Sequence, residues 1–197
     1  AIDHDCDAIA VSLDVAKAFD SISTERGLEA LRIVGFPPAL INILRAFYAS
    51  KPCHAFQLGP IMSNFYPRSR GWLQGCSGSV LVMLSVMCIA HHVVQLPAVT
   101  MWSFVDDLAL LARRGGHRSV DQAISTLCAT LQAFGLTLNT AKSGAVGMRD
   151  VPLPVSVPGT TAITFLGIPL ALDWQGGKRR VGVLMDARCD RGIQLAK

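Results

Sequence analysis

The segment that decides the fold reads TMWSFVDDLALLA and runs from Thr100 to Ala112. Two short apolar runs are separated only by Asp106 and Asp107, which indicates a β-hairpin. Such a turn favours Asn-Gly or Asp-Gly, and because this one has no glycine, turn chemistry does not explain the acidic pair. Adjacent carboxylates between apolar runs are costly to desolvate unless a cation compensates them, and Mg²⁺ would do so. A solvated acidic turn is the alternative, and it is the commoner case for an isolated Asp-Asp pair.

A third carboxylate follows another apolar stretch near the start of the chain. Ala8–Leu13 is apolar and partly β-branched, which is typical of a buried strand, and it is followed by Asp14. If this strand lies beside the hairpin in one sheet, Asp14, Asp106 and Asp107 converge. Hard oxygen ligands at strand ends are what two Mg²⁺ ions about 3.5–4 Å apart require in phosphoryl transfer. A lone Asp at a strand end is more often structural.

The rest of the chain alternates helical and strand patterns. We expect Ser23 or Thr24 to cap a helix over 25–34 that Gly35 ends, and Pro37 and Pro38 to open a second one. The second helix carries a row of apolar residues on one face: Leu40, Ile41, Leu44, Phe47 and Tyr48. Two further helices are predicted over 78–94 and 119–134, and four strands over 53–58, 144–148, 161–166 and 180–184.

The length, composition and charge of the chain exclude some classes of protein. The 197 residues suit one domain, and 51% hydrophobic against 16% charged residues excludes a disordered chain. The six cysteines lack zinc-ligand spacing, so we expect reduced thiols in an intracellular protein, in the nucleus or the cytoplasm. The longest apolar stretch, Val80–Ala90, falls short of the roughly 20 residues of a membrane span, so no membrane partner is expected. A net charge of +4 is only weak support for a polyanionic partner.

Five segments resemble the ordered motifs of one enzyme family, the reverse transcriptases of non-LTR retrotransposons and group II introns. Motifs A to E are matched in turn by Leu13–Asp20, by Gly71–Cys76 with Ser79, by Phe104–Asp107, by Gly135–Asn139 with Lys142 and Ser143, and by Phe165–Gly167. One such match is weak, whereas five in the right order from Leu13 to Gly167 are specific.

The resemblance implies an RNA-directed DNA polymerase, a nucleotidyltransferase that joins deoxynucleotides to a primer 3′-hydroxyl. The implied fold is the α+β polymerase palm, a small antiparallel sheet of ferredoxin-like arrangement packed by helices. The implied partners are an RNA template, a DNA primer and deoxynucleoside triphosphates, with two Mg²⁺ ions, or Mn²⁺ in their place, as cofactor. The implied metal ligands are Asp14, Asp106, Asp107 and the carbonyl of Val15.

The resemblance also implies roles at the substrate. Phe19 is the expected steric gate that excludes a 2′-hydroxyl, although without motif A it would be interpreted as a core aromatic. Gln74 and Gly75 would lie against the incoming nucleotide and the template. Lys142 would be the general acid that protonates pyrophosphate. The primer grip would consist of Phe165, Leu166 and Gly167.

The chain also departs from the family pattern. The family pattern usually has a proline shortly after the residues that match Gln74 and Gly75, and here Cys76–Val80 contains none. Few residues lie outside Leu13–Gly167, so we expect one domain over 1–197 that holds a palm, with fingers and thumb largely left to a parent retrotransposon polyprotein. An RNA-dependent RNA polymerase is less favoured, because Val105 and Phe19 stand where that family usually has glycine and a smaller or polar residue. The open alternative is a catalytically inactive remnant or a nucleic-acid-binding module.

Overall fold

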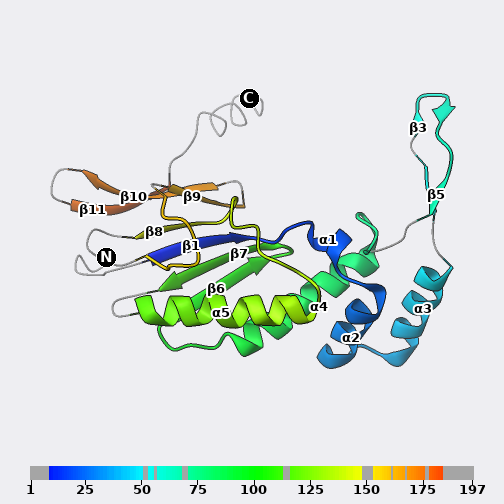
Figure 1. The fold of residues 1–197 in the computed structure, drawn as a ribbon, viewed down its shortest axis with the longest axis horizontal. Helices are drawn as coiled ribbons and strands as arrows, with labels where there is room; N and C mark the ends of the chain where they lie inside the picture. Colours follow the sequence, from blue (N-terminus) through cyan, green and yellow to red (C-terminus); the bar gives the residue numbers. More distant parts are fainter. Residues whose placement is uncertain are drawn as a thin grey trace, which may run out of the picture. The chain divides into compact units, whose positions relative to one another are not determined.

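The computed structural model describes residues 9–50, 53–55, 57–67, 71–112, 116–147, 153–160, 162–166, 168–175 and 178–183. Figure 1 shows the helices and strands along the chain. The chain divides into two compact units. The sheet unit comprises Ala1–Val15, Val94–Cys128 and Leu138–Lys197, and the helical unit comprises Ala16–Val93 and Ala129–Thr137.

A four-stranded antiparallel sheet is the centre of the sheet unit (Figure 1). Its strands are β1 (Ile9–Asp14), β6 (Val99–Phe104), β7 (Asp107–Ala112) and β8 (Gly144–Gly147), in the order β6-β7-β1-β8. Helices intervene between β1 and β6 and between β7 and β8, which gives the β-α-β-β-α-β order of the ferredoxin-like arrangement. The expected α+β fold with a small antiparallel sheet is confirmed.

The two faces of this sheet differ in burial. Along β1, Ile9, Val11 and Leu13 are buried, whereas Ser12 and Asp14 are partly exposed. Side chains alternate between faces along a strand, so Asp14 points away from the core. The buried face is continued by Leu108 and Leu110 of β7, which lie opposite Leu13 and Val11. The helix α5 (His117–Ala133) adds buried residues at helical spacing: Val120, Ala123, Ile124 and Leu127.

The acidic hairpin is confirmed, but its turn lies one residue earlier than expected. Phe104 pairs with Asp107, so the two central residues of the turn are Val105 and Asp106. Asp107 is therefore the first residue of β7 and belongs to the sheet ladder. The expectation that both aspartates form the turn was wrong, because Val105 takes a left-handed conformation with φ of 57° that a β-branched residue rarely adopts.

A second, three-stranded sheet in the order β11-β10-β9 follows β8. Its strands are β9 (Ala162–Phe165), β10 (Ile168–Gln175) and β11 (Lys178–Val183). The strands expected over 161–166 and 180–184 correspond to β9 and β11, while β10 was not predicted. The hydroxyl of Ser12 donates to the carbonyl of Thr164 over 2.7 Å. Because Ser12 points to the same face as Asp14, this bond brings β9 to the face that carries Asp14.

The helical unit contains α1 (Ala18–Ser21), α2 (Thr24–Val34), α3 (Pro38–Ala49) and α4 (Ser77–Val93). The hydroxyl of Ser23 caps α2 by accepting from the amide of Arg26, and Gly35 ends this helix in a left-handed conformation, as predicted. In α3 the buried side chains are Ile41, Leu44 and Tyr48, while Phe47 is 44% exposed. No described helix is long and apolar enough to cross a membrane.

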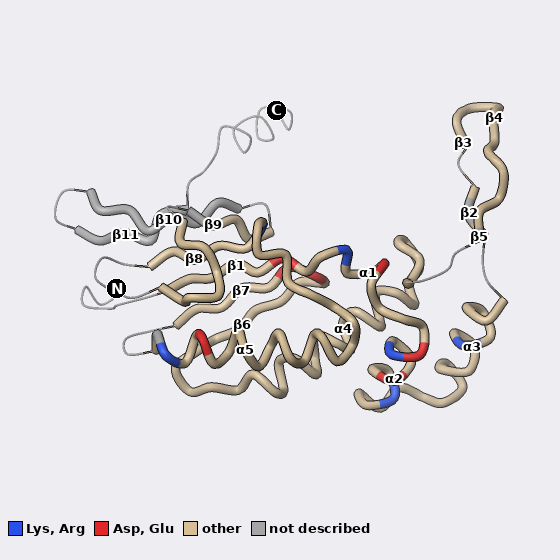
Figure 2. The backbone as a smooth tube through the Cα atoms, in the orientation of Figure 1, with Lys and Arg blue, Asp and Glu red and all other residues tan. Residues whose placement is uncertain are grey.

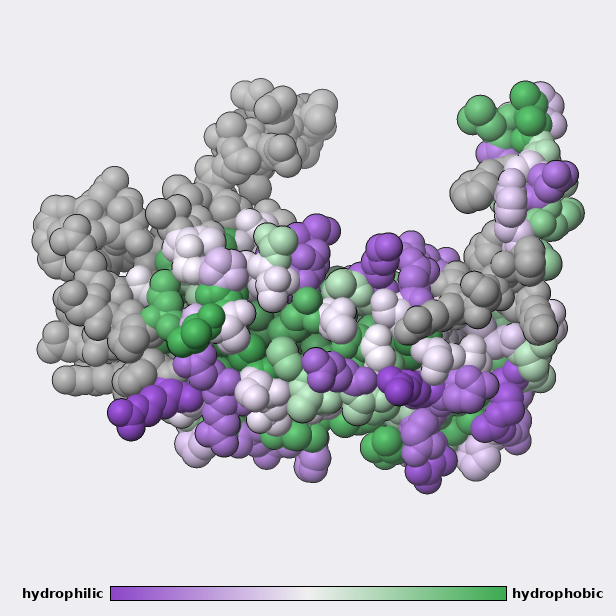
Figure 3. Space-filling model, in the orientation of Figure 1, coloured by the Kyte–Doolittle hydropathy of each residue, from purple (hydrophilic) through white to green (hydrophobic). Residues whose placement is uncertain are grey.

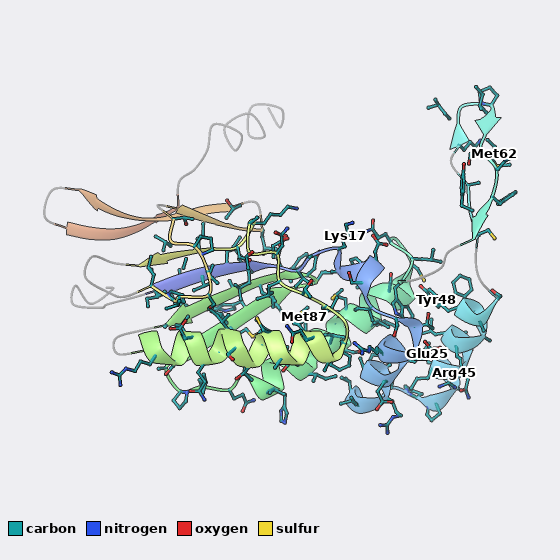
Figure 4. The ribbon with its side chains drawn as sticks, viewed as in Figure 1. Lys17, Glu25, Arg45, Tyr48, Met62 and Met87 are labelled. Atoms are coloured by element: carbon teal, nitrogen blue, oxygen red, sulfur yellow. The ribbon has the colours of Figure 1, made fainter. Side chains whose placement is uncertain are left out.

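Trp72 is the central buried residue of the helical unit. Its indole is fully buried and donates to the carbonyl of Ser23 over 3.3 Å. The ring lies beside Tyr48, a residue labelled in Figure 4, with 4.3 Å between ring centroids. A side-chain carbon on Gly27 would lie 2.5 Å from the indole, so α2 needs glycine there to approach the ring.

Two short strand pairs follow α3. The first joins β2 (Cys53–His54) to β5 (Tyr66–Pro67), and the second joins β3 (Gln57–Leu58) to β4 (Ile61–Met62). The single strand expected over 53–58 is thus two separate strands. Hydrophobic side chains gather at the tip of the β3–β4 hairpin (Figure 3), where Leu58 is 81% exposed.

Candidate active site

Acidic residues meet at the edge of the sheet where β1 ends and β7 begins (Figure 2). The register places Asp14 directly opposite Asp107, so both side chains point to the same face, away from the core. Asp106 precedes Asp107 in the turn. The sequence prediction that the two segments lie on neighbouring strands of one sheet is therefore confirmed.

Residues opposite each other in an antiparallel sheet form one of two types of pair, and Asp14 and Asp107 form the type with the shorter Cα–Cα distance. The carbonyl of Asp14 accepts from the amide of Asn139 over 2.7 Å, and its amide donates to the hydroxyl of Ser143 over 3.1 Å. Both backbone groups of Asp14 thus face the side away from β7. Asp14 and Asp107 therefore form a non-hydrogen-bonded pair, in which Cα atoms are typically about 4.5 Å apart and side chains are closest.

Electrostatics at this edge are unfavourable in the absence of a cation. Burial raises the pKa of the Asp107 carboxyl, and the negative charges of Asp106 and Asp14 raise it further. Like charges directly opposite each other destabilise a sheet. A bound divalent cation would reverse this effect, since each carboxylate then faces a positive charge.

The turn that carries Asp106 is strained. Val105 has a φ of 57°, and a β-branched side chain in that region is a true outlier. Such strain costs on the order of 1–3 kcal/mol and is found disproportionately where function fixes the backbone. The strained turn therefore supports a functional reading of the Asp106–Asp107 pair over a solvated acidic turn.

The segment that matches motif D forms backbone hydrogen bonds with the end of β1. Val15 is buried and forms an antiparallel bridge with Leu138. The flanking bonds of this bridge involve the carbonyl of Asp14 and the amide of Ala16, not the carbonyl of Val15. The expected role of the Val15 carbonyl as an oxygen ligand is compatible with this pattern and stays a prediction.

Lys142 lies in the turn that follows this bridge. Its side chain is exposed, and its amide donates to the carbonyl of Asn139 over 3.1 Å. Ser143, the next residue, bonds to the backbone of Asp14. The turn thus ties Lys142 to the strand end that carries Asp14. Its role as a general acid stays a prediction.

The residues expected at the nucleotide lie in the helical unit. Phe19 in α1 is partly exposed rather than buried, and its carbonyl accepts from the amide of Trp72 over 2.7 Å. This bond joins motif A to motif B. Gln74 and Gly75 are exposed, and Gly75 has a φ of 84°, so the turn itself requires glycine. Open space surrounds the position of a side chain on Gly75.

The entry to α4 forms without the proline that the family pattern usually has. The hydroxyl of Ser79 is buried and donates to the carbonyls of Leu73 and Cys76, at 2.6 and 2.5 Å. The helix begins at Ser77. The Ser79 side chain thus connects the turn that matches motif B to the first turn of α4.

The expected primer grip belongs to the sheet unit. Phe165 ends β9 and is partly exposed, and Leu166 is 45% exposed with a φ of 53°. Gly167 lies outside the described residues. The Ser12–Thr164 bond holds the preceding part of β9 to the face of the sheet that carries Asp14. The grip function stays a prediction.

The donor chemistry of the acidic edge fits a hard divalent cation. Three aspartates provide carboxylate oxygens, the ligands that Mg²⁺ and Mn²⁺ prefer. Among the described residues, no group of three His, Cys, Asp or Glu side chains is gathered closely enough to hold an ion. The structure places Asp14 opposite Asp107 with Asp106 in the adjoining turn, and the closure of their carboxylates around a shared ion stays a prediction.

Sequence reasoning missed the residues that hold this edge from behind. The hydroxyl of Ser143 accepts from the amide of Asp14, and the amide of Asn139 donates to the carbonyl of Asp14. Ser143 stood in the motif D match, but a sequence match assigns it no contact.

A family model described as "Reverse transcriptase (RNA-dependent DNA polymerase)" matches residues 3–170. A curated relative, the "Retrovirus-related Pol polyprotein from type-1 retrotransposable element R2" of Popillia japonica, is 27% identical over 164 residues. That match covers 77% of this chain and 27% of the polyprotein.

Solved telomerase structures share the fold. Telomerase from Candida tropicalis, in complex with a fragment of telomeric RNA, has a TM-score of 0.61 at 13% identity over 92% of this chain and 30% of that chain. Telomerase from Candida albicans, also with a telomeric RNA fragment, has a TM-score of 0.57 at 14% identity over 89% of this chain and 31% of that chain. The chain thus spans less than a third of the length of each of these relatives.

Proposed function

The chain belongs to the reverse transcriptase (RNA-dependent DNA polymerase) family, and from that premise we propose that it carries the catalytic centre of an RNA-directed DNA polymerase. Its sequence relative places it with the non-LTR retrotransposons. The observation that carries the proposal is the register of β1 and β7, which sets Asp14 opposite Asp107 with Asp106 in the adjoining strained turn.

Asp14, Asp106, Asp107 and the carbonyl of Val15 would hold two Mg²⁺ ions, or Mn²⁺ in their place. The chemistry that such ions supply when bound is Lewis-acid chemistry, which acidifies a hydroxyl and neutralises phosphate charge. The raised pKa of Asp107 supports this assignment, because the carboxylates repel one another until a cation joins them. Reverse transcriptases in general use divalent metal ions.

The other residues would act on the substrates. Phe19 would close the space beside the sugar of the incoming nucleotide, so that a 2′-hydroxyl does not fit. Gln74 and the exposed Gly75 turn would contact the nucleotide and the template. Lys142 would deliver a proton to the departing pyrophosphate. Phe165, Leu166 and Gly167 would hold the primer end.

The proposed substrates are an RNA template, a DNA primer and deoxynucleoside triphosphates. The telomerase neighbours were solved with telomeric RNA, which supports an RNA partner for this fold. We also propose an intracellular location, because the thiols of Cys76, Cys88 and Cys128 form no disulfide.

Primer extension on an RNA template tests the proposal, in the parent polymerase that carries this segment. Asp106→Asn should lower nucleotide addition by about 10²–10³-fold, because metal-centred charge stabilisation contributes several kcal/mol at ~1.4 kcal/mol per factor of ten. The matched control is Glu25→Gln, which removes one carboxylate from the exposed first turn of α2, where Figure 4 labels Glu25. Equal extension by both variants would contradict the metal assignment, whereas no extension by the unmodified polymerase would favour an inactive remnant.

A further inference from the structure

Ser143 is one of three buried polar side chains among the described residues, with Ser79 and Ser85. The hydroxyl of Ser85 bonds within its own helix to Leu81, and that of Ser79 closes the entry of the same helix. Ser143 differs, because its hydroxyl joins two segments that are 129 residues apart in sequence. It accepts from the amide of Asp14 at 3.1 Å and donates to the carbonyl of Asn139 at 2.8 Å.

On the side of β1 that faces β8, Asp14 pairs with no residue of β8, and the Ser143 contact lies at this point. The ladder between β1 and β8 covers only Ile9–Ser12, so it ends two residues before Asp14. Beyond that point, Asn139 and Ser143 take the place of a strand and bond to the carbonyl and the amide of Asp14. On its other side Asp14 faces the like charge of Asp107. The two bonds from the 139–143 turn therefore fix the backbone of Asp14 on the side away from β7.

We propose that Ser143 is a positioning residue of the catalytic centre, whose hydroxyl fixes the backbone of Asp14 and thereby holds its carboxylate against those of Asp106 and Asp107. The inference rests on the proposed function, since it concerns the same three carboxylates. Without the hydroxyl, the amide of Asp14 loses its acceptor and the end of β1 is held less firmly. The carboxylate of Asp14 is then less well positioned, and a shared cation binds less tightly.

Mn²⁺ binding to the purified chain tests this role without requiring polymerase activity. The matched pair is Ser143→Thr and Ser143→Val, which add the same bulk and differ only in the hydroxyl. Ser143→Val should weaken Mn²⁺ binding about threefold to tenfold relative to Ser143→Thr, the range that one lost hydrogen bond supplies. Isothermal titration with Mn²⁺ alone measures this ratio. Equal affinities for the two variants would overturn the proposal.

Hydrogen exchange at the Asp14 amide provides a second readout, which a general loss of stability would not reproduce. In the unmodified chain this amide should be protected, and in Ser143→Val it should exchange faster while the amides of β7 keep their protection. Ser85→Ala, which removes another buried hydroxyl, should change neither Mn²⁺ affinity nor the Asp14 amide. An unprotected Asp14 amide in the unmodified chain would overturn the proposal even if the Ser143 variants fail to fold.

The experiment also separates this inference from the proposed function. If Asp14→Asn abolishes Mn²⁺ binding while Ser143→Val matches Ser143→Thr, the metal site stands and the positioning role is wrong. If Asp14→Asn leaves Mn²⁺ binding unchanged, the proposed metal site is wrong and the role of Ser143 falls with it.

Discussion

Replacing Asp107 by Asn removes one of the two negative charges that face each other across β1 and β7. We expect this substitution to stabilise the chain at neutral pH in the absence of divalent ions, which is unusual for a change at a sheet position. The reason is that burial, and in addition the negative charges of Asp106 and Asp14, disfavour the ionised carboxyl of Asp107 in the folded state and raise its pKa. Asn keeps the shape of the side chain and removes the repulsion.

The size of the effect follows from the pairing. In a non-hydrogen-bonded antiparallel pair the Cβ atoms are about 4.5–5.5 Å apart, and the carboxyl groups can turn away to roughly 6 Å. Two unit charges at that distance repel by about 0.7 kcal/mol in water. Salt lowers this value and partial burial raises it, so we expect a gain of about 0.5–1 kcal/mol, or ~1–4 °C in Tm for a chain of this length.

The stability difference between Asp107→Asn and the unmodified chain should depend on pH. Because the pKa of Asp107 is raised in the folded chain, the folded state holds this proton more tightly than the unfolded state does. Ionisation of Asp107 therefore lowers stability as pH rises from the unfolded-state pKa, about 3.9, through the raised folded-state value. The advantage of Asp107→Asn should be complete above the folded-state pKa and should vanish below the unfolded-state pKa.

Thermal unfolding across this pH range, without and then with 10 mM Mg²⁺, is the assay. Glu25→Gln is the control, because it also removes one carboxylate but from the first turn of α2, where a negative charge is favourable. The control should be neutral or destabilised at pH 7. Mg²⁺ should stabilise the unmodified chain and not Asp107→Asn. A loss of stability in Asp107→Asn at pH 7, or a gain that persists in acid, would show that the ionised Asp107 carboxylate does not destabilise the fold.

Three other substitutions test separate parts of the structure. Gly27→Ala would place a carbon 2.5 Å from the buried Trp72 ring, so urea unfolding should show a loss of about 1–3 kcal/mol, and an unchanged midpoint would contradict the close approach. Val105→Gly should relieve the positive φ of the acidic turn and raise stability by up to about 1–2 kcal/mol, and a lower Tm would show that the turn is not strained. In the parent polymerase, Phe19→Val should raise ribonucleotide incorporation relative to deoxynucleotide incorporation, and unchanged discrimination in primer extension would remove Phe19 from the gate role.

The sequence was sufficient for those parts of the fold in which local pattern and tertiary packing agree. The apolar and partly β-branched stretch Ala8–Leu13 predicts a buried strand, and Ser23 with Gly35 predicts both ends of α2. These features are local, because periodicity and capping are properties of adjacent residues. The position of Asp14 on a strand beside the acidic hairpin also followed from strand ends and the order of the motifs.

The rest depended on contacts that no local pattern records. The turn of the acidic hairpin lies at Val105 and Asp106, because strand pairing overrides the preference of valine against positive φ. Phe47 lies at helical spacing beside buried residues, yet it is exposed. Ser143 bonds to Asp14 across 129 residues of sequence, a distance over which composition carries no signal.

Paramagnetic broadening by Mn²⁺ shows whether Asp14, Asp106 and Asp107 share a divalent cation. In an ¹⁵N-labelled chain titrated with Mn²⁺, the amide signals of Asp14, Asp106 and Asp107 should broaden first and together. Excess Mg²⁺ should restore them, and Asp14→Asn should prevent the broadening at all three positions. Broadening that begins elsewhere in the chain, or that reaches Asp106 and Asp107 unchanged in Asp14→Asn, would contradict the shared site.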